Sequence, residues 1–173
     1  MTSRFPPIHL GAPGEEISKK DLHAVTQRFK YFNQGRLQRM REFLQPRQYE
    51  FLHLLPLLFP QNHPLLPGFV SLETPAGIPD YLPGKQTVDT AKQFSKGFTY
   101  KRKALRNYPI QSIFLMGSVG SMAFSKDSDI DIWLCHQPNL SITELEELRQ
   151  KARLVEKWAE SLKLEVHFFL VNS

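Results

Sequence analysis

The most informative part of this sequence is Phe114-Leu-Met-Gly-Ser-Val-Gly-Ser-Met-Ala-Phe-Ser-Lys-Asp-Ser-Asp-Ile-Asp-Ile-Trp-Leu-Cys-His136. Its first residues are apolar, its middle is rich in glycine and serine, and its end alternates between polar and apolar residues. This pattern predicts a buried strand over 110–116, a tight helical turn over 118–124 and a second strand over 129–135.

Two aspartates in the second strand are candidate metal ligands. Successive side chains of a strand point to opposite faces, so Ile130 and Ile132 face the core while Asp129 and Asp131 project together from the other face. Two carboxylates held so close repel each other unless a cation lies between them. Mg²⁺ fits this arrangement, because it takes one or two carboxylates and completes its shell with water and substrate phosphates. The alternative is a strand end with two solvated acids.

Gly117 and Ser118 are candidates for binding phosphate. They lie where the first strand ends and the short helix is expected to begin. Glycine allows a ligand to approach the backbone closely, and free N–H groups at a helix start attract phosphate. A triphosphate bound here would reach toward the paired aspartates and share their Mg²⁺. Ser118 could also simply cap its helix.

A third acidic residue is expected for a site with two metal ions, and Glu165 is the candidate. The segment 164–171 reads as a third strand, with Leu164, Val166 and Phe168 on one face and Glu165 and His167 on the other. One ion of a pair could activate an attacking hydroxyl and the other could stabilise leaving pyrophosphate. A surface acid beside a lysine is the alternative interpretation of Glu165.

The rest of the chain divides into three parts: an irregular lead-in over 1–14, a helical segment over 15–107 with a Pro-rich loop at 60–84, and the sheet-containing core over 108–173. Four helices are expected. The first begins after Ser18 and is interrupted near Gly35, the second begins at Pro46, the third runs from Asp89 to about Asn107, and the fourth runs from a capping box at Ser141 to about Leu162.

Composition narrows the function classes. The chain has 173 residues, a formal charge of +5 and a pI of about 9.4, which suggests anionic ligands without choosing among them. No apolar run is long enough to span a bilayer, so membrane insertion is not expected. Cys135 is the only cysteine, which favours a cytoplasmic setting and argues against structural zinc. The basic group between Lys96 and Arg106 is more typical of a solvated face than of a nucleic-acid site.

Several residues near the acids are expected to have structural rather than catalytic roles. His63 and His136 have no paired ligand nearby in the sequence and are expected to be structural, and Cys135 is expected to pack in or beside the sheet. Trp133 falls on the aspartate face, where it either borders a nucleotide or covers the sheet.

The spacing of Gly117-Ser118 and Asp129-Ile-Asp-Ile132 resembles the signature of the DNA polymerase beta-like nucleotidyltransferases. A closer resemblance, to the N-terminal region of the class I adenylate cyclases of proteobacteria, extends over the following segments: Leu54-Leu-Pro-Leu-Leu58, His63-Pro-Leu-Leu-Pro-Gly68, Met116-Gly-Ser118, Asp129-Ile-Asp-Ile-Trp-Leu-Cys-His-Gln137 and Glu165-Val-His-Phe-Phe-Leu170.

This resemblance implies an α+β, nucleotidyltransferase-like core, with a small mixed sheet and flanking helices, preceded by a helical N-terminal segment. It implies that ATP is converted to cyclic AMP and pyrophosphate with Mg²⁺, or Mn²⁺ in its place. By resemblance, Gly117 and Ser118 contact phosphates, Asp129 and Asp131 bind metal, and Glu165 falls where a third acid is expected. Family members continue beyond the third strand, so the core is expected to be incomplete at its C-terminus.

Two other functions stay open on the sequence. One is an intermolecular nucleotidyltransferase that acts on a protein, an antibiotic or RNA. The other is a non-catalytic module that binds a regulatory protein or the C-terminal remainder of a longer chain. Nucleic acid is not favoured as a partner.

Overall fold

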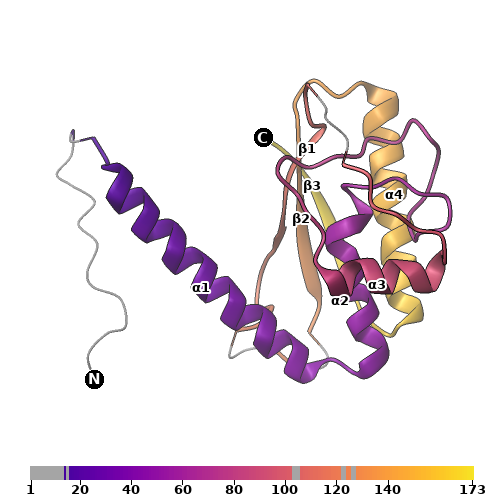
Figure 1. Cartoon of the computed structure of the whole chain (residues 1–173), viewed down its shortest axis with the longest axis horizontal. Coiled ribbons are helices and arrows are strands. Elements are labelled where there is room, and N and C mark those ends of the chain that lie inside the picture. The colour runs from indigo at the N-terminus through magenta and orange to yellow at the C-terminus, as the bar shows by residue number, and fades with distance from the viewer. Residues whose placement is uncertain (1–13, 15, 103–105, 122–123, 126–127) are drawn as a thin grey trace.

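The fold is α+β and is built on one mixed sheet of three strands (Figure 1). It is seen in a computed structural model that describes residue 14 and residues 16–102, 106–121, 124–125 and 128–173. The strands are β1 (Ile110–Leu115), β2 (Ile130–His136) and β3 (Val166–Asn172), in the order β1-β2-β3. β1 is antiparallel to β2, and β2 is parallel to β3. The expected small mixed sheet is therefore confirmed, as are its three strands to within two residues at each end.

Alternation along the strands separates a buried face from an open one. Ile130, Ile132 and Leu134 of β2 are at most 1% exposed, and Val166 lies beside Ile130 in the parallel register. The apolar residues of this face pack against helices on one side of the sheet, which Figure 1 shows edge-on. The predicted division of β2 into a core face and an acidic face is thereby confirmed.

Helix α4 (Ile142–Ser161) connects β2 to β3 across the buried face. It begins at the predicted capping box: the Ser141 side chain accepts from the Glu144 N–H, and the Glu144 carboxylate accepts from the Ser141 N–H. Its apolar stripe includes Leu148 and Val155, both fully buried, which anchors the crossover on the sheet. A parallel pair needs such a crossover, and the helix supplies it.

The C-terminal half of helix α1 (Lys19–Phe43) lies against the sheet-containing part of the chain, and its N-terminal half projects away from it (Figure 1). Ser18 caps it as predicted, but the helix runs through Gly35 without interruption. A glycine costs a helix only about 1 kcal/mol, which the contacts of Arg36 and Met40 after it offset. Met40 is fully buried, whereas Phe29 and Phe32 on the projecting half are 56% and 68% exposed.

The second predicted helix is a short 3₁₀ turn (Pro46–Gln48) that leads directly into α2 (Tyr49–Leu58). Pro46 occupies the first turn, as expected. Pro56 lies inside α2, which ends two residues later. Most of the helix is buried, including Phe51, Leu54 and Leu58, and Phe59 just after it contacts Phe168 of β3 with ring centroids 5.2 Å apart.

Residues 60–84 form the predicted loop, with no helix or strand among them. The loop lies against α4 at Gly68, where a Cβ atom would come within 2.5 Å of a Val155 methyl group. Under the loop, the ammonium of Lys151 donates to the Asn62 side-chain oxygen at 3.1 Å. Lys151 is only 1% exposed, and burial lowers its pKa to about 8.

The prediction for the third helix is wrong. Helix α3 spans Lys85–Phe94 and begins after Gly84, so Asp89 lies inside it rather than at its cap. The helix ends before Gly97, not near Asn107; residues 103–105 lie outside the described part of the chain. The lead-in over 1–14 also falls outside it, apart from Gly14. Among the described helices, none has the length and hydrophobicity needed to cross a membrane.

Candidate metal and phosphate site

The predicted site residues all lie at one end of the sheet. Because β1 is antiparallel to β2, the end of β1 lies beside the start of β2, and the parallel β3 starts at the same end. The turn after β1, with Gly117 and Ser118, therefore lies next to the aspartates that open β2 and to Glu165 just before β3.

The turn after β1 is not a helix in its described part. Residues 117–120 form consecutive turns and Ser121 is a bend, with the Ser121 N–H donating to the Ser118 carbonyl at 2.8 Å. Gly117 and Gly120 have φ of +63° and +67°, which a right-handed helix does not allow. The predicted helical turn is therefore wrong over 118–121, while residues 122–123 lie outside the described chain. Any phosphate contact here depends on the N–H groups of the turn and the Ser118 hydroxyl.

Asp131 faces this turn. A Cβ atom added to Gly117 would lie 3.3 Å from a carboxylate oxygen of Asp131. The Asp131 side chain is half-buried on the open face of the sheet and is paired in register with His167 of β3. The geometry thus brings together one of the paired aspartates and the glycine that precedes Ser118.

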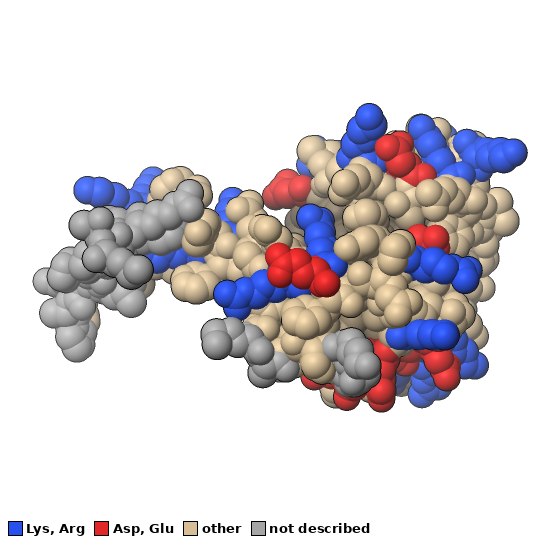
Figure 2. Space-filling view, turned by 90° about the horizontal axis from the view of Figure 1, so that it is seen from below, with Lys and Arg blue, Asp and Glu red and all other residues tan. Residues whose placement is uncertain are grey.

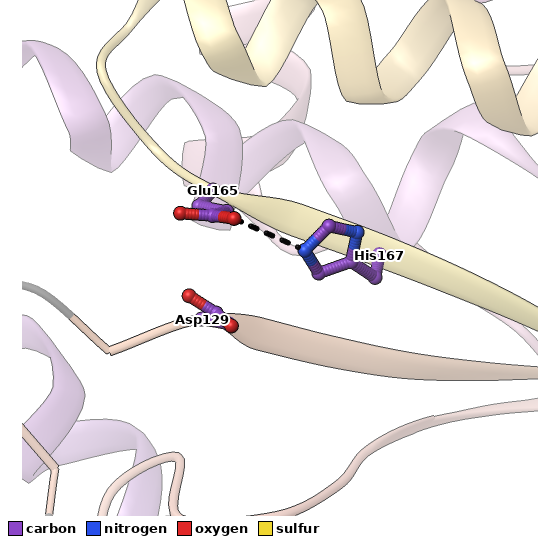
Figure 3. Close-up of side chains that lie close together, drawn as sticks. All are labelled: Asp129, Glu165 and His167. Carbon is purple, nitrogen blue, oxygen red and sulfur yellow. Dashed lines mark ion pairs between the residues drawn. The ribbon is translucent and has the colours of Figure 1, made fainter.

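Asp129, Glu165 and His167 form a second group at the start of β2 and β3 (Figure 3). One ligand atom from each lies within 4.8 Å of the others, and all three residues are exposed. His167 Nε2 lies 3.4 Å from a Glu165 oxygen. Ligand atoms around Mg²⁺ lie about 2.1 Å from the ion and hence roughly 3–4 Å from one another. Small side-chain rotations would bring these atoms to that spacing, so the group fits a divalent cation.

The two groups share one face, but their carboxylates are not one cluster. Asp129 and Asp131 project from the same side of β2, as predicted, yet Asp131 turns toward Gly117 while Asp129 turns toward Glu165. Glu165 lies just before β3 rather than inside it, and it is exposed on the face opposite the apolar side chains, as predicted. Asp129 and Glu165 could share one cation, with Asp131 placed between it and the turn.

The sequence interpretation did not treat His167 as a ligand. The alternation along β3 did place it on the face of Glu165, and that spacing of two was the available signal. An imidazole nitrogen beside two carboxylates makes the group suitable for transition-metal ions as well as Mg²⁺. Transition-metal ions bind imidazole readily, whereas Mg²⁺ prefers oxygen ligands.

The residues that follow the aspartates in β2 lie where the sequence predicts. Cys135 and His136 are buried, and His136 Nδ1 lies 2.9 Å from the Gln137 carbonyl oxygen. Trp133 is 41% exposed on the face of Asp131, with Phe114 and Phe169 beside it in register on the two flanking strands.

The basic net charge is not gathered into one patch on the face shown in Figure 2, where Lys and Arg side chains are interspersed with Asp and Glu. Of the described basic residues between Lys96 and Arg106, Arg102 pairs with Asp80 at 3.5 Å, and both side chains are exposed. This agrees with the solvated face expected from the sequence.

A three-stranded mixed sheet that presents acids at one end beside a glycine turn defines a class of α+β domain with a candidate metal and phosphate site. Residues 21–173 match the family described as the adenylate cyclase NT domain, and the chain belongs to that family. No solved structure matches the chain.

The chain is similar to several curated adenylate cyclases. It is 35% identical over 153 residues to the adenylate cyclase of Salmonella typhimurium (strain LT2), and 34% identical over 153 residues to those of Escherichia coli (strain K12) and Yersinia pestis. Each match covers 87% of this chain and 18% of the relative. The chain therefore corresponds to less than a fifth of these relatives.

Proposed function

We propose that this chain carries the nucleotide-binding and metal-binding part of a class I adenylate cyclase with a nucleotidyltransferase-like core. The observation that supports the proposal most directly is the meeting of three segments at one end of the sheet. Asp131 faces the glycine of the turn, and Asp129 lies with Glu165 and His167. Relatives over this region are named adenylate cyclase, which favours ATP as the substrate.

In this proposal, the acidic residues bind the metal ion and the turn after β1 binds the triphosphate. Asp129, Asp131 and Glu165 hold Mg²⁺ or Mn²⁺, with His167 as an additional ligand within reach. The Gly117-Ser118 turn binds the triphosphate through backbone N–H groups and the Ser118 hydroxyl. When bound, the metal would neutralise phosphate charge and favour departure of pyrophosphate. Cytoplasmic localisation is part of the same proposal, since the lone Cys135 does not depend on an oxidising compartment.

The proposed reaction is internal to one ATP molecule. The ribose 3′-oxygen forms a bond to the α-phosphorus, the bond from the α-phosphorus to the bridging oxygen breaks, and pyrophosphate leaves with that oxygen. The hydroxyl proton passes to a carboxylate of the site or to water. The chain's residues contribute by holding the triphosphate at the turn and the metal at the acids, so that the reacting atoms lie in one place.

Calorimetry with a non-hydrolysable ATP analogue tests the binding step. Wild-type protein is titrated with the analogue and Mn²⁺ and compared with the double variant Asp129→Asn plus Asp131→Asn. The charge-matched control is Asp89→Asn plus Glu146→Gln, which removes one exposed carboxylate from α3 and one from α4. We expect the metal-dependent affinity to be lost in the first variant and kept in the control. Equal binding in all three proteins would contradict the proposal and favour a non-catalytic module.

Product analysis tests the reaction class. Protein incubated with α-labelled ATP and Mn²⁺ should release labelled cyclic AMP. Label found instead on a protein, antibiotic or RNA acceptor would identify an intermolecular nucleotidyltransferase.

A further inference from the structure

The glycine turn after β1 is held from outside the sheet by one side chain of α1. The Arg36 guanidinium donates from Nε to the Val119 carbonyl at 2.9 Å, and from one Nη to the carbonyls of Leu115 at 3.4 Å and Gly117 at 3.3 Å. Arg36 and Val119 are 83 positions apart in the chain. One side chain of the N-terminal helix therefore hydrogen-bonds to three backbone carbonyls in or next to the candidate phosphate-binding turn.

The approach of α1 to the turn is close and depends on a glycine. A Cβ atom added to Gly120 would lie 2.1 Å from the backbone oxygen of Arg36, which no side chain could tolerate. Further along α1, the ring of Phe43 meets Phe124 edge to face with centroids 5.8 Å apart. These contacts fix the helix against both ends of the described turn, so the Arg36 bonds belong to a packed interface.

The three acceptors determine where the N–H groups of the turn point. In a trans peptide the carbonyl and the N–H point in opposite directions. The peptide that directs the Leu115 carbonyl at Arg36 directs the Met116 N–H the other way, where it donates to the Asp131 carbonyl at 2.8 Å. By the same rule, the Gly117 and Val119 carbonyls aim the N–H groups of Ser118 and Gly120 away from α1.

Arg36 also brings positive charge to the back of the turn. Its guanidinium is half-buried and forms none of the ion pairs found within the described part of the chain. Because its hydrogen bonds are to neutral carbonyls, these contacts do not neutralise its positive charge, which favours an anion on the far side of the turn.

We propose that Arg36 is a positioning residue for the triphosphate: it holds the carbonyls of the turn so that the Ser118 and Gly120 N–H groups face the phosphates. This inference rests on the proposed function, since it assumes that the turn binds phosphate. Lysine at this position would keep the charge but lose the fork that binds several carbonyls at once, so the charge alone should not suffice.

The test uses inorganic tripolyphosphate with Mn²⁺, titrated calorimetrically into wild-type protein, Arg36→Lys, Arg36→Ala and the control Arg39→Ala. Arg39 is exposed on the same helix. Titrations are made well below each protein's melting temperature, and Mn²⁺ alone is titrated in parallel. A residue that only stabilised the fold would lower the melting temperature without changing the affinity of the folded protein.

We expect both Arg36 variants to bind tripolyphosphate about tenfold more weakly or worse, while their affinity for Mn²⁺ alone and the behaviour of Arg39→Ala stay at the wild-type level. The amide resonances of Ser118 and Gly120 should shift in both Arg36 variants. Wild-type tripolyphosphate affinity in folded Arg36→Lys and Arg36→Ala would overturn the role of Arg36 and leave the proposed function standing. Failure of wild-type protein to bind tripolyphosphate with Mn²⁺ would instead remove the proposed function together with this inference.

Discussion

Replacement of Lys151 by methionine should make the protein more stable at neutral pH. The lysine is 1% exposed beneath the Pro-rich loop, and burial lowers its pKa from 10.5 to about 8. Methionine fills a similar volume without a charge to bury. The hydrogen bond to the Asn62 oxygen is lost in the variant, which offsets part of the gain.

The magnitude follows from the two pKa values. Below pH 8 the lysine is charged in both the folded and the unfolded chain, and burying that charge costs on the order of 3 kcal/mol of stability. Between pH 8 and 10.5 the unfolded chain binds more protons than the folded one, so stability rises with pH and the penalty disappears. With about 1 kcal/mol subtracted for the bond to Asn62, the variant should gain roughly 2 kcal/mol at pH 7.

Urea unfolding measured from pH 7 to pH 10 would check this. Tryptophan fluorescence reports unfolding, because Trp158 packs in the structure with its ring 5.7 Å from that of Phe51. The advantage of Lys151→Met over wild type should shrink by about 2–3 kcal/mol across that range. Lys157→Met, on the exposed side of the same helix, is the control and should follow the wild-type curve. Parallel curves for Lys151→Met and wild type would refute the reasoning, because they would show that the lysine keeps its ordinary pKa in the folded protein.

Three substitutions test the packing and the helices, each by its urea midpoint. Gly35→Ala should raise stability by about 0.5–1 kcal/mol, because an added methyl group meets no atom within 4 Å and favours the helix; a lower midpoint would contradict this. Ser141→Ala should lower stability by about 1 kcal/mol through loss of the capping box, and an unchanged midpoint would show that the cap contributes nothing. Phe59→Ala should lower it by about 3–5 kcal/mol, since the fully buried ring leaves a cavity; a loss below 1 kcal/mol would mean that the core refills it.

The sheet and its open acidic face could be predicted because they depend on short-range alternation. The residues Ile130, Asp131 and Ile132 must point to alternate faces whatever the remainder of the chain does. Likewise, Ser141 and Glu144 cap a helix through contacts three positions apart. Both patterns carry their own physical cause, and both are found in the structure.

Features that depend on distant contacts could not be predicted in the same way. The expected break at Gly35 does not occur, because Arg36 and Met40 contact segments far along the chain and hold the helix in place. Nothing in the sequence near Gly35 indicates these contacts. Asp89 could have served as a cap, but α3 begins earlier, directly after Gly84. The orientation of Asp131 toward Gly117 and of Asp129 toward Glu165 depends on which strands are neighbours, and alternation leaves that open.

The roles of the five site residues stay predictions. The structure confirms that Asp129 and Asp131 share a face and that Glu165 lies within reach of Asp129. It also adds His167, whose spacing of two from Glu165 puts both side chains on one face of the strand. Which metal ion binds depends on the ligand preference of each ion and on its availability in the cell. The arrangement of side chains alone therefore does not determine the metal.

Because β2 and β3 pair in a fixed parallel register, the connections before and after α4 should differ in how well they tolerate inserted residues. Ile130 is opposite Val166, so if α4 stayed in place, one residue added between Ser161 and Glu165 would bring Leu164 or the added residue to the position now occupied by the glutamate. The connection before α4, residues 137–141, has no such constraint, because a longer loop there could bulge outward while the helix stayed seated. Natural or engineered insertions should therefore be found before this helix and be absent after it.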